Sequence, residues 1–295
     1  MERVKEERLA TAIVLVTGAL WGFYWIPVRA LDAGGLTGAW GTCAIGAAAV
    51  ALLFPLVIRR RAIADCDRLS LLFIALGGAA FALYSVGFLY GRVAMIILLY
   101  FLTPVWSVLI ARFVMGWETP VLRLVAIVVG LAGLGLMLGG SEGWPLPGSS
   151  GEWMALVAGM LWSVSTTGIR ARPETAPLEA AFTFALGAVV TAAILAMATS
   201  GPPKVPDLTA PAETLTIAFV TGIVWWGASI TALLWAAERL EPARVGLLLM
   251  SEVLIGAATA AVFAGERLTG AEMAGGALVL MAGLMEVWPV RRARR

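Results

Sequence analysis

Long apolar runs recur along the whole chain, and each is about as long as the ~20 residues that a helix needs to cross a bilayer. Lipid offers no water to open backbone groups, so every run must be helical. Sixty per cent of the 295 residues are apolar and only 14% are charged, which is outside the range of soluble domains. The sequence therefore predicts an all-α integral membrane protein with ten transmembrane helices, over residues 9–29, 37–58, 69–91, 93–113, 120–139, 152–170, 178–199, 213–237, 243–264 and 270–288.

The basic residues test this map, because loops on the cytoplasmic side of a membrane are enriched in Lys and Arg. Of the 21 Lys and Arg residues, all but Arg29, Arg92, Lys204 and Arg267 fall on the side that also holds both chain ends. We therefore expect a multi-pass protein of a bacterial inner (cytoplasmic) membrane with cytoplasmic N- and C-termini. The net charge of +2 indicates no nucleic-acid partner.

The chain also contains an internal repeat. The string GALWGFYWIPVRA at residues 18–30 returns as GMLWSVSTTGIRA at residues 159–171, with Trp21 and Arg29 corresponding to Trp162 and Arg170. Each half holds five predicted spans, and an odd number makes equivalent helices cross in opposite directions. This predicts two five-helix inverted-topology repeats, an architecture widespread among secondary transporters. The predicted divisions are a first repeat at 1–140, a connecting loop at 141–151, a second repeat at 152–290 and a basic cytoplasmic tail at 291–295.

Several function classes lack the residues that they need. The chain has no His, and its two cysteines, Cys43 and Cys66, are expected at opposite ends of the second span, too far apart for a disulfide. Neither a metal site nor a cofactor is predicted. The phosphate-binding pattern G-x-x-x-x-G-K-[ST] is absent from the sequence, so ATP is not expected to be the direct energy source.

A second repeat closes each half. Residues 101–118 read FLTPVWSVLIARFVMGWE, residues 249–266 read LMSEVLIGAATAAVFAGE, and a Gly-rich final span follows each. With the early Trp of each half, Pro104, Glu118 and Glu266, this arrangement resembles the drug/metabolite transporter superfamily, in its ten-span EamA-type branch. Overall the chain is most similar to YddG-type exporters of aromatic amino acids. That family often has Glu-Pro in its ninth span, where this chain has Glu252-Val253, so a Pro-induced kink is not expected there.

Glu252 is the most unusual residue for its predicted position. It falls near the bilayer centre, where a carboxylate costs about 2.5–3.5 kcal/mol on insertion scales and must face a cavity or a partner. Two interpretations stay open. Glu252 contacts a substrate amine or couples protons, or it makes a structural hydrogen bond to a Ser, Thr or Trp on a neighbouring helix.

Aromatic residues at mid-span depth form the second candidate set. Trp and Tyr normally gather at the membrane interfaces, so mid-depth rings suggest a lined cavity that would stack on a flat solute. Packing of the same rings in the core is the alternative. Together with Glu252, the predicted substrate-binding residues are Trp21, Tyr24, Tyr84, Tyr100, Trp162 and Ser165. In the final span of the first half, Gly135 and Gly139 form a small-xxx-small pattern that favours close helix packing.

The combined prediction is a secondary transporter, not an enzyme. We expect it to export small organic solutes, most simply amino acids with aromatic or large apolar side chains and related metabolites, by alternating access through a midplane cavity. Its partners would be the small-molecule substrate and the lipid bilayer, with proton coupling left open. One chain suffices for a pathway, and a dimer stays open. A proton-coupled multidrug exporter is the main alternative, although span 1 lacks a carboxylate between Leu9 and Val28. An integral membrane enzyme is the alternative from another class.

Overall fold

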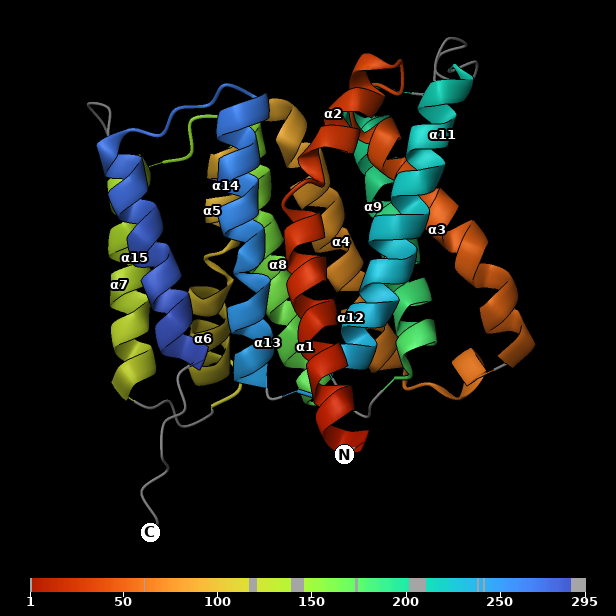
Figure 1. Cartoon of the computed structure of the whole chain (residues 1–295), viewed down its shortest axis with the longest axis horizontal. Helices are drawn as coiled ribbons and strands as arrows, with labels where there is room; N and C mark the ends of the chain where they lie inside the picture. Colours follow the sequence, from red (N-terminus) through yellow and green to blue (C-terminus); the bar gives the residue numbers. More distant parts are fainter. Residues whose placement is uncertain are drawn as a thin grey trace.

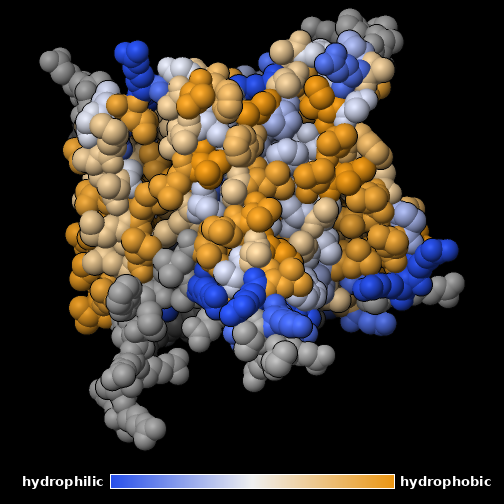
Figure 2. Space-filling model, viewed as in Figure 1, coloured by the Kyte–Doolittle hydropathy of each residue, from blue (hydrophilic) through white to orange (hydrophobic). Residues whose placement is uncertain are grey.

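The chain folds into a slab of upright helices without a described β-strand (Figure 1). The computed structural model describes residues 2–60, 62–116, 121–138, 146–172, 175–201, 211–237, 239–240 and 242–287. Over these residues the chain crosses the slab ten times, as the sequence predicts. The surface that faces the viewer in Figure 2 is hydrophobic across its middle, and hydrophilic residues gather along its upper and lower edges.

The first half contains five crossings. Their elements are α1 (Glu2–Trp21), α2 (Trp25–Ala33), α3 (Ala39–Arg60), η1 (Ala62–Asp65), α4 (Arg68–Tyr90), α5 (Val93–Tyr100), α6 (Thr103–Phe113) and α7 (Val121–Leu138). The second half contains five more. Their elements are α8 (Ser150–Arg170), α9 (Pro177–Thr199), α11 (Ala212–Thr221), η2 (Gly222–Ser229), α12 (Ile230–Ala237), α13 (Pro242–Leu249), α14 (Ser251–Phe263) and α15 (Gly270–Val287).

Local sequence fixes several helix starts. Asp67 caps α4 by accepting a hydrogen bond from the Ser70 backbone N–H at 2.8 Å, and Ser149 caps α8 by accepting one from the Glu152 N–H at 3.2 Å. Proline occupies the first turn of α6 and of α9, where its missing N–H costs nothing. The starts of α4, α8 and α9 agree with the predicted span limits to within two residues, whereas α6 begins inside the predicted span 93–113.

The crossings differ in how well each fits a lipid environment. In the described part of the chain, seven helical stretches are long and apolar enough to span a membrane, and Ser251–Phe263 and Gly270–Met285 are shorter apolar helices. The helix α8 is outside both groups because its second half carries Ser163, Ser165, Thr166 and Thr167. It packs against α4, α5 and α6, so this polar stretch lies against protein.

Successive crossings alternate in direction, so α1 begins at the face of the slab where α8 ends (Figure 1). That face, called the basic face below, also carries the end of α3 with Arg59 and Arg60 and the start of α4 with Arg68. The opposite face carries Arg29, Arg92 and Arg267. The predicted separation of basic residues is therefore present in the described residues, whereas Lys204 lies outside them.

Glycines allow the closest helix contacts. A Cβ on Gly78 of α4 would lie 1.9 Å from the Phe184 carbonyl oxygen of α9, so only Gly fits. Between α7 and α15, a Cβ on Gly133 would lie 2.7 Å from the Gly275 carbonyl oxygen. The predicted contact at Gly135 is wrong, because Gly135 has open space where a Cβ would be. Its pattern partner Gly139 lies outside the described residues, and the close packing uses a neighbouring face of the same helix.

Four crossings are interrupted near their middle. The first breaks at residues 22–24 between α1 and α2, the fourth at residues 101–102 between α5 and α6, and the ninth at Met250 between α13 and α14. In the eighth crossing the interruption is the π-helix η2. The ninth crossing is therefore interrupted although it contains Glu252-Val253 in place of Glu-Pro. Interrupted helices free backbone groups at mid-depth, an arrangement found where transporters bind their solutes.

Candidate functional site

Glu252 sits at the first turn of α14, directly after the break at Met250, and is 6% exposed. The phenolic O–H of Tyr84, on α4, donates a hydrogen bond to its Oε1 at 2.8 Å. The free N–H groups at a helix start carry partial positive charge, which favours a carboxylate in the first turn. The hydrogen-bond partner of Glu252 is Tyr84, so the predicted Ser, Thr or Trp partner is wrong.

Aromatic rings surround this bond. The ring of Tyr84 lies 4.5 Å from the ring of Tyr100 and 6.0 Å from that of Phe81, measured between centroids. Phe81 in turn lies 4.8 Å from Trp21 and 5.1 Å from Trp162. The contacts are mostly edge-to-face or tilted, the geometries that aromatic pairs favour.

Tyr24 joins this group through Trp21, at 4.9 Å between ring centroids. It also contacts Phe88, Trp225 and Trp226, at 6.3 to 6.4 Å. The rings and Glu252, here called the aromatic cluster, lie on α1, α4, α5, α8, η2 and α14, with Tyr24 at the break before α2. The cluster consists of Trp21, Tyr24, Phe81, Tyr84, Phe88, Tyr100, Trp162, Trp225, Trp226 and Glu252. Six of the seven predicted site residues belong to it.

The cluster is densely packed. Tyr24, Tyr84, Phe88 and Trp226 are fully buried, and Trp21, Phe81 and Tyr100 are at most 7% exposed. The rings pack against one another in the region where the sequence predicts a cavity. In this state the structure brings the predicted residues together but closes the space between them.

Hydroxyl groups fix the orientation of the rings. The Tyr24 hydroxyl pairs with Ser85 Oγ at 2.9 Å, and Ser85 Oγ pairs with Thr42 Oγ1 at 2.8 Å. The Trp21 indole N–H donates to Ser229 Oγ at 3.1 Å. These bonds link α1 and its break to α3, α4 and η2. A change in the relative position of these helices must therefore break or replace them.

Ser165, the seventh predicted residue, behaves differently from its neighbours. Thr166 Oγ1 donates to the Trp162 carbonyl oxygen at 2.9 Å, and Ser163 Oγ donates to the Gly159 carbonyl oxygen at 2.8 Å. Such bonds back to the helix are common for Ser and Thr. Ser165 is fully buried and lies against Gly77 of α4, and its Oγ has no hydrogen-bond partner among the described residues. An unsatisfied buried hydroxyl beside the cluster is available to a bound solute.

Four rings of the cluster, Phe81, Phe88, Trp225 and Trp226, are mid-span aromatic residues that the predicted substrate-binding set leaves out. Two further residues that contact the cluster were missed altogether. Thr42 completes the hydroxyl chain from Tyr24, and Phe184 of α9 packs on Phe81 at 5.2 Å between ring centroids. Neither residue has a distinguishing sequence signal, because an isolated Thr or Phe is common in any apolar helix. Only the packing of α3 and α9 against α4 brings them in.

A set of ion pairs lies on the face opposite the basic face. The Glu266 carboxylate accepts the backbone N–H groups of Val93 and Ala94 at 2.7 and 3.0 Å, capping α5. It also pairs with Arg29 at 3.7 Å. Arg92 pairs with Glu272, and this bond raises the pKa of the Arg92 guanidinium above its ordinary value. Glu266 therefore caps α5, and Glu118 lies outside the described residues.

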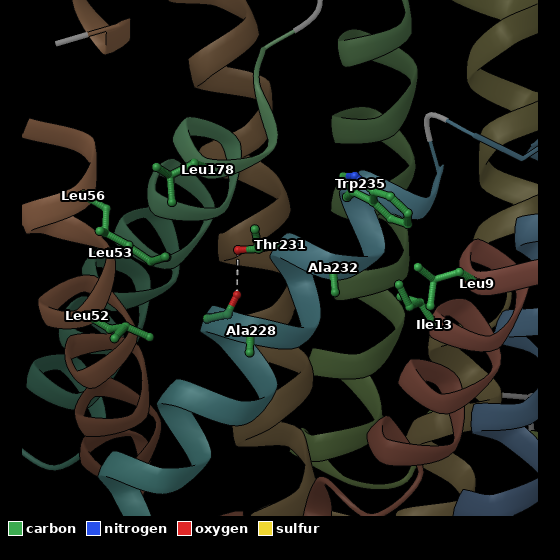
Figure 3. Close-up of a pocket in the computed structure, with 11 residues that line it drawn as sticks. Leu9, Ile13, Leu52, Leu53, Leu56, Leu178, Ala228, Thr231, Ala232 and Trp235 are labelled. Atoms are coloured by element: carbon green, nitrogen blue, oxygen red, sulfur yellow. Dashed lines mark hydrogen bonds between the residues drawn. The ribbon is translucent and has the colours of Figure 1, made fainter. Parts of the chain in front are cut away.

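A separate hollow, here called the lateral groove, opens between α1 and α3 in the half of the slab nearest the basic face. Leu52 and Leu56 form one side, Leu9 and Ile13 form the other, and Ala228 and Ala232 lie between them (Figure 3). Its volume is about 560 Å³, within the range of sites for small molecules. The complete lining is Leu9, Ile13, Leu52, Leu53, Leu56, Leu178, Gly227, Ala228, Thr231, Ala232 and Trp235.

The fold and the cluster define a class: a multi-pass α-helical membrane protein with a carboxylate and aromatic rings buried where its helices are interrupted. Comparison with protein families adds that residues 149–286, just under half of the chain, match the EamA-like transporter family. The match covers the whole second half of the helical slab, from the cap of α8 to α15.

Comparison with solved structures extends the likeness in fold to the whole chain. One similar crystal structure is described only as that of a protein. Its sequence is 17% identical to this chain, and the two folds superpose with a TM-score of 0.59. The alignment covers 94% of this chain and 95% of the other. At this identity the likeness shows the fold alone. No curated protein matches the sequence.

Proposed function

We propose that this chain is a secondary transporter that exports small organic solutes, most simply amino acids with aromatic or large apolar side chains. The observation that carries the proposal is the aromatic cluster around the Tyr84–Glu252 hydrogen bond, at the level where four crossings are interrupted. The match of residues 149–286 to the EamA-like transporter family supports transport as the activity. The likeness to YddG-type exporters belongs to this proposal as well.

The cluster suits such a solute chemically. A carboxylate pairs with a substrate ammonium, and the faces of Trp and Tyr attract a cation or stack on a flat ring. The unpartnered hydroxyl of Ser165 offers a further hydrogen bond. Trp21, Tyr24, Tyr84, Tyr100, Trp162, Ser165 and Glu252 are accordingly the proposed substrate-binding residues.

Alternating access would use the two halves of the chain as inverted repeats, residues 1–140 and 152–290. The opposite directions of α1 and α8 support this division (Figure 1). The ion pairs of Glu266 with Arg29 and of Glu272 with Arg92 join separate helices at the face opposite the basic face. We place the basic face in the cytoplasm of a bacterial cell, because Lys and Arg concentrate there. In this orientation, the ion pairs must part for a solute to leave the cell.

Counterflow in proteoliposomes tests the proposal. Vesicles loaded with phenylalanine or tryptophan should accumulate the labelled amino acid, and vesicles loaded with glutamate should not. Mass spectrometry of solutes outside expressing cells should identify the same class. Absence of counterflow for every aromatic or large apolar amino acid would contradict the substrate class. Transport of several unrelated hydrophobic cations instead would favour the multidrug exporter.

Proton coupling is tested separately with Glu252→Gln. If Glu252 carries the proton, this variant loses transport driven by a pH gradient but retains counterflow, which needs no gradient. The matched control is Glu213→Gln, which changes an exposed carboxylate in the first turn of α11. Gradient-driven transport that survives Glu252→Gln would exclude this residue as the coupling group.

A further inference from the structure

We propose that the lateral groove binds one acyl chain of an anionic phospholipid from the leaflet at the basic face. This site is separate from the aromatic cluster and does not depend on the identity of the transported solute. Three features of the groove carry the inference: its length, its lack of polar groups, and the basic residues at its outer end.

The groove has the length of a chain within one leaflet. Along η2 and α12 it extends from Gly227 to Trp235, about 12 Å at 1.5 Å per residue. Half of the ~30 Å hydrocarbon core is about 15 Å. The groove therefore runs from near the membrane interface toward the midplane, as an acyl chain does.

The lining offers a ligand almost no polar group. Thr231 is the only hydroxyl residue among the lining residues, and its Oγ1 donates to the Gly227 carbonyl oxygen at 2.7 Å, the dashed line in Figure 3. An amino acid would bury its ammonium and carboxylate here without partners, at a cost of several kcal/mol. A hydrocarbon chain carries no such cost, so the groove favours a lipid tail over the proposed substrate.

Basic residues lie one turn beyond the groove on three of its helices. Lys5 precedes Leu9 by four residues on α1, and Arg59 and Arg60 follow Leu56 by three and four residues on α3. Residues at these spacings share a helix face. Below α12, the Arg239 guanidinium stacks on Trp235 at 4.0 Å from the ring centroid.

These residues give the outer end of the groove a positive charge. The described acidic residues near this end are Glu6 and Glu7 on α1, Asp65 in η1, and Glu179, which follows the lining residue Leu178 and is 1% exposed. The basic residues Lys5, Arg8, Arg59, Arg60 and Arg239 outnumber them, and the Glu179 carboxylate is buried away from a headgroup. Each basic residue near an anionic surface strengthens binding about fivefold. A phosphate headgroup at this level would therefore meet the cations while its chain fills the groove. The charge selects phosphatidylglycerol over the zwitterionic phosphatidylcholine.

Quenching of tryptophan fluorescence by lipids with brominated chains tests the proposal in vesicles. Subtracting the signal of Trp235→Phe from that of the parent protein isolates Trp235. Brominated phosphatidylglycerol should quench Trp235 at least twofold more than brominated phosphatidylcholine at the same mole fraction. Trp153, exposed at the start of α8 near the opposite face, is isolated in the same way and should show no preference. Equal quenching of Trp235 by the two lipids would overturn the proposal.

Two pairs of variants separate the headgroup from the chain. The double variant Arg59→Gln/Arg60→Gln should remove the preference for phosphatidylglycerol, whereas Arg267→Gln, on the opposite face, should keep it. Ala232→Leu fills the groove and should reduce quenching of Trp235 by both lipids. Ala261→Leu adds the same bulk at an exposed site on α14 and should not. Unchanged quenching of Trp153 reports that each variant is folded.

A last arm distinguishes a lipid from a free anion. Glycerol 1-phosphate carries the charge without the chain, so an excess of it should leave the quenching of Trp235 by brominated phosphatidylglycerol unchanged. Displacement by glycerol 1-phosphate would show an anion site without a chain and would overturn the proposal. Survival of the headgroup preference in the double Arg variant would do the same.

Discussion

The Tyr84–Glu252 hydrogen bond joins α4 of the first half to α14 of the second, and its strength can be measured. The perturbations are Tyr84→Phe, which removes the hydroxyl that lies 2.8 Å from Glu252 Oε1, and Glu252→Met, which keeps the approximate length of the side chain but removes the oxygen that accepts the bond. A double-mutant cycle combines the two and isolates their coupling free energy.

The expected magnitude follows from burial. Hydrogen bonds between neutral groups in membrane proteins couple by about 0.6 kcal/mol on average, and bonds to an ionised partner are worth about 1.5–3 kcal/mol. Glu252 is 6% exposed and Tyr84 is fully buried, so water competes weakly for the bond. We expect a coupling free energy of about 0.6 kcal/mol or more, because the two buried groups have few other hydrogen-bond partners to exchange with.

The assay is reversible unfolding in mixed micelles, with the unfolding free energy measured for the parent protein, both single variants and the double variant. Tyr90→Phe is the matched control, since Tyr90 ends the same helix and is 41% exposed. Its coupling to Glu252→Met should be near zero. A coupling below about 0.3 kcal/mol for Tyr84 would refute the reasoning, because the bond would then contribute nothing that water or another partner does not replace.

Three further predictions concern packing, the ion pairs and a thiol. Gly78→Ala should lower the unfolding free energy by about 1–3 kcal/mol, since its Cβ would clash with the Phe184 carbonyl oxygen, and Gly135→Ala, with open space around it, should not; the same unfolding assay measures both. Glu266→Gln weakens the capping of α5 and the ion pair with Arg29. Residues at the face opposite the basic face should then react faster with a membrane-impermeant label. An unchanged labelling rate would show that these interactions do not restrict access to that face. Burial, and to a lesser degree the negative charges of Glu179 and Asp65, raise the pKa of the Cys66 thiol above its ordinary value. Less thiolate is then present at pH 8. In a Cys43→Ala background, alkylation of Cys66 should accelerate only at a higher pH than alkylation of a small-molecule thiol.

Much of the fold could be predicted from the sequence because membrane insertion depends on one-dimensional properties. Apolar runs of sufficient length predicted the crossings, and the positions of Lys and Arg predicted which ends of the crossings share a face. The ends of α3 at Arg60 and of α4 at Tyr90 fall within two residues of the predicted limits. The helix α8 was found by the same pattern, although its hydroxyl residues make it less apolar than the others.

The helix interruptions could not be predicted in the same way. Pro104 marks the break between α5 and α6, but the break at Met250 has no proline. It forms where α13 and α14 pack against α1, and a Cβ on Gly18 of α1 would lie 2.3 Å from Ser251 Oγ. Such a contact depends on two helices more than 200 residues apart, so no local pattern reports it.

The sequence predicted many residues of the candidate site but not which residues they contact. Depth in the membrane selected Glu252 and the mid-span rings, and the structure brings them together. The choice of Tyr84 as the partner of Glu252 depends on the rotation of α4, which local sequence does not define. The rotation of α7 likewise could not be predicted: Gly133, not Gly135, makes the close contact with Gly275 of α15.

The π-helix η2 has one further consequence. Gly227 lines the lateral groove, and its neighbour Trp226 packs on Tyr24 inside the aromatic cluster, so adjacent residues of η2 reach the groove and the cluster. A π-turn holds more residues than an α-turn. Re-forming this stretch as α-helix would rotate the side chains beyond it about the helix axis. Trp226 would then lose its packing on Tyr24, so the lining of the groove and the packing of the rings depend on the same stretch of η2.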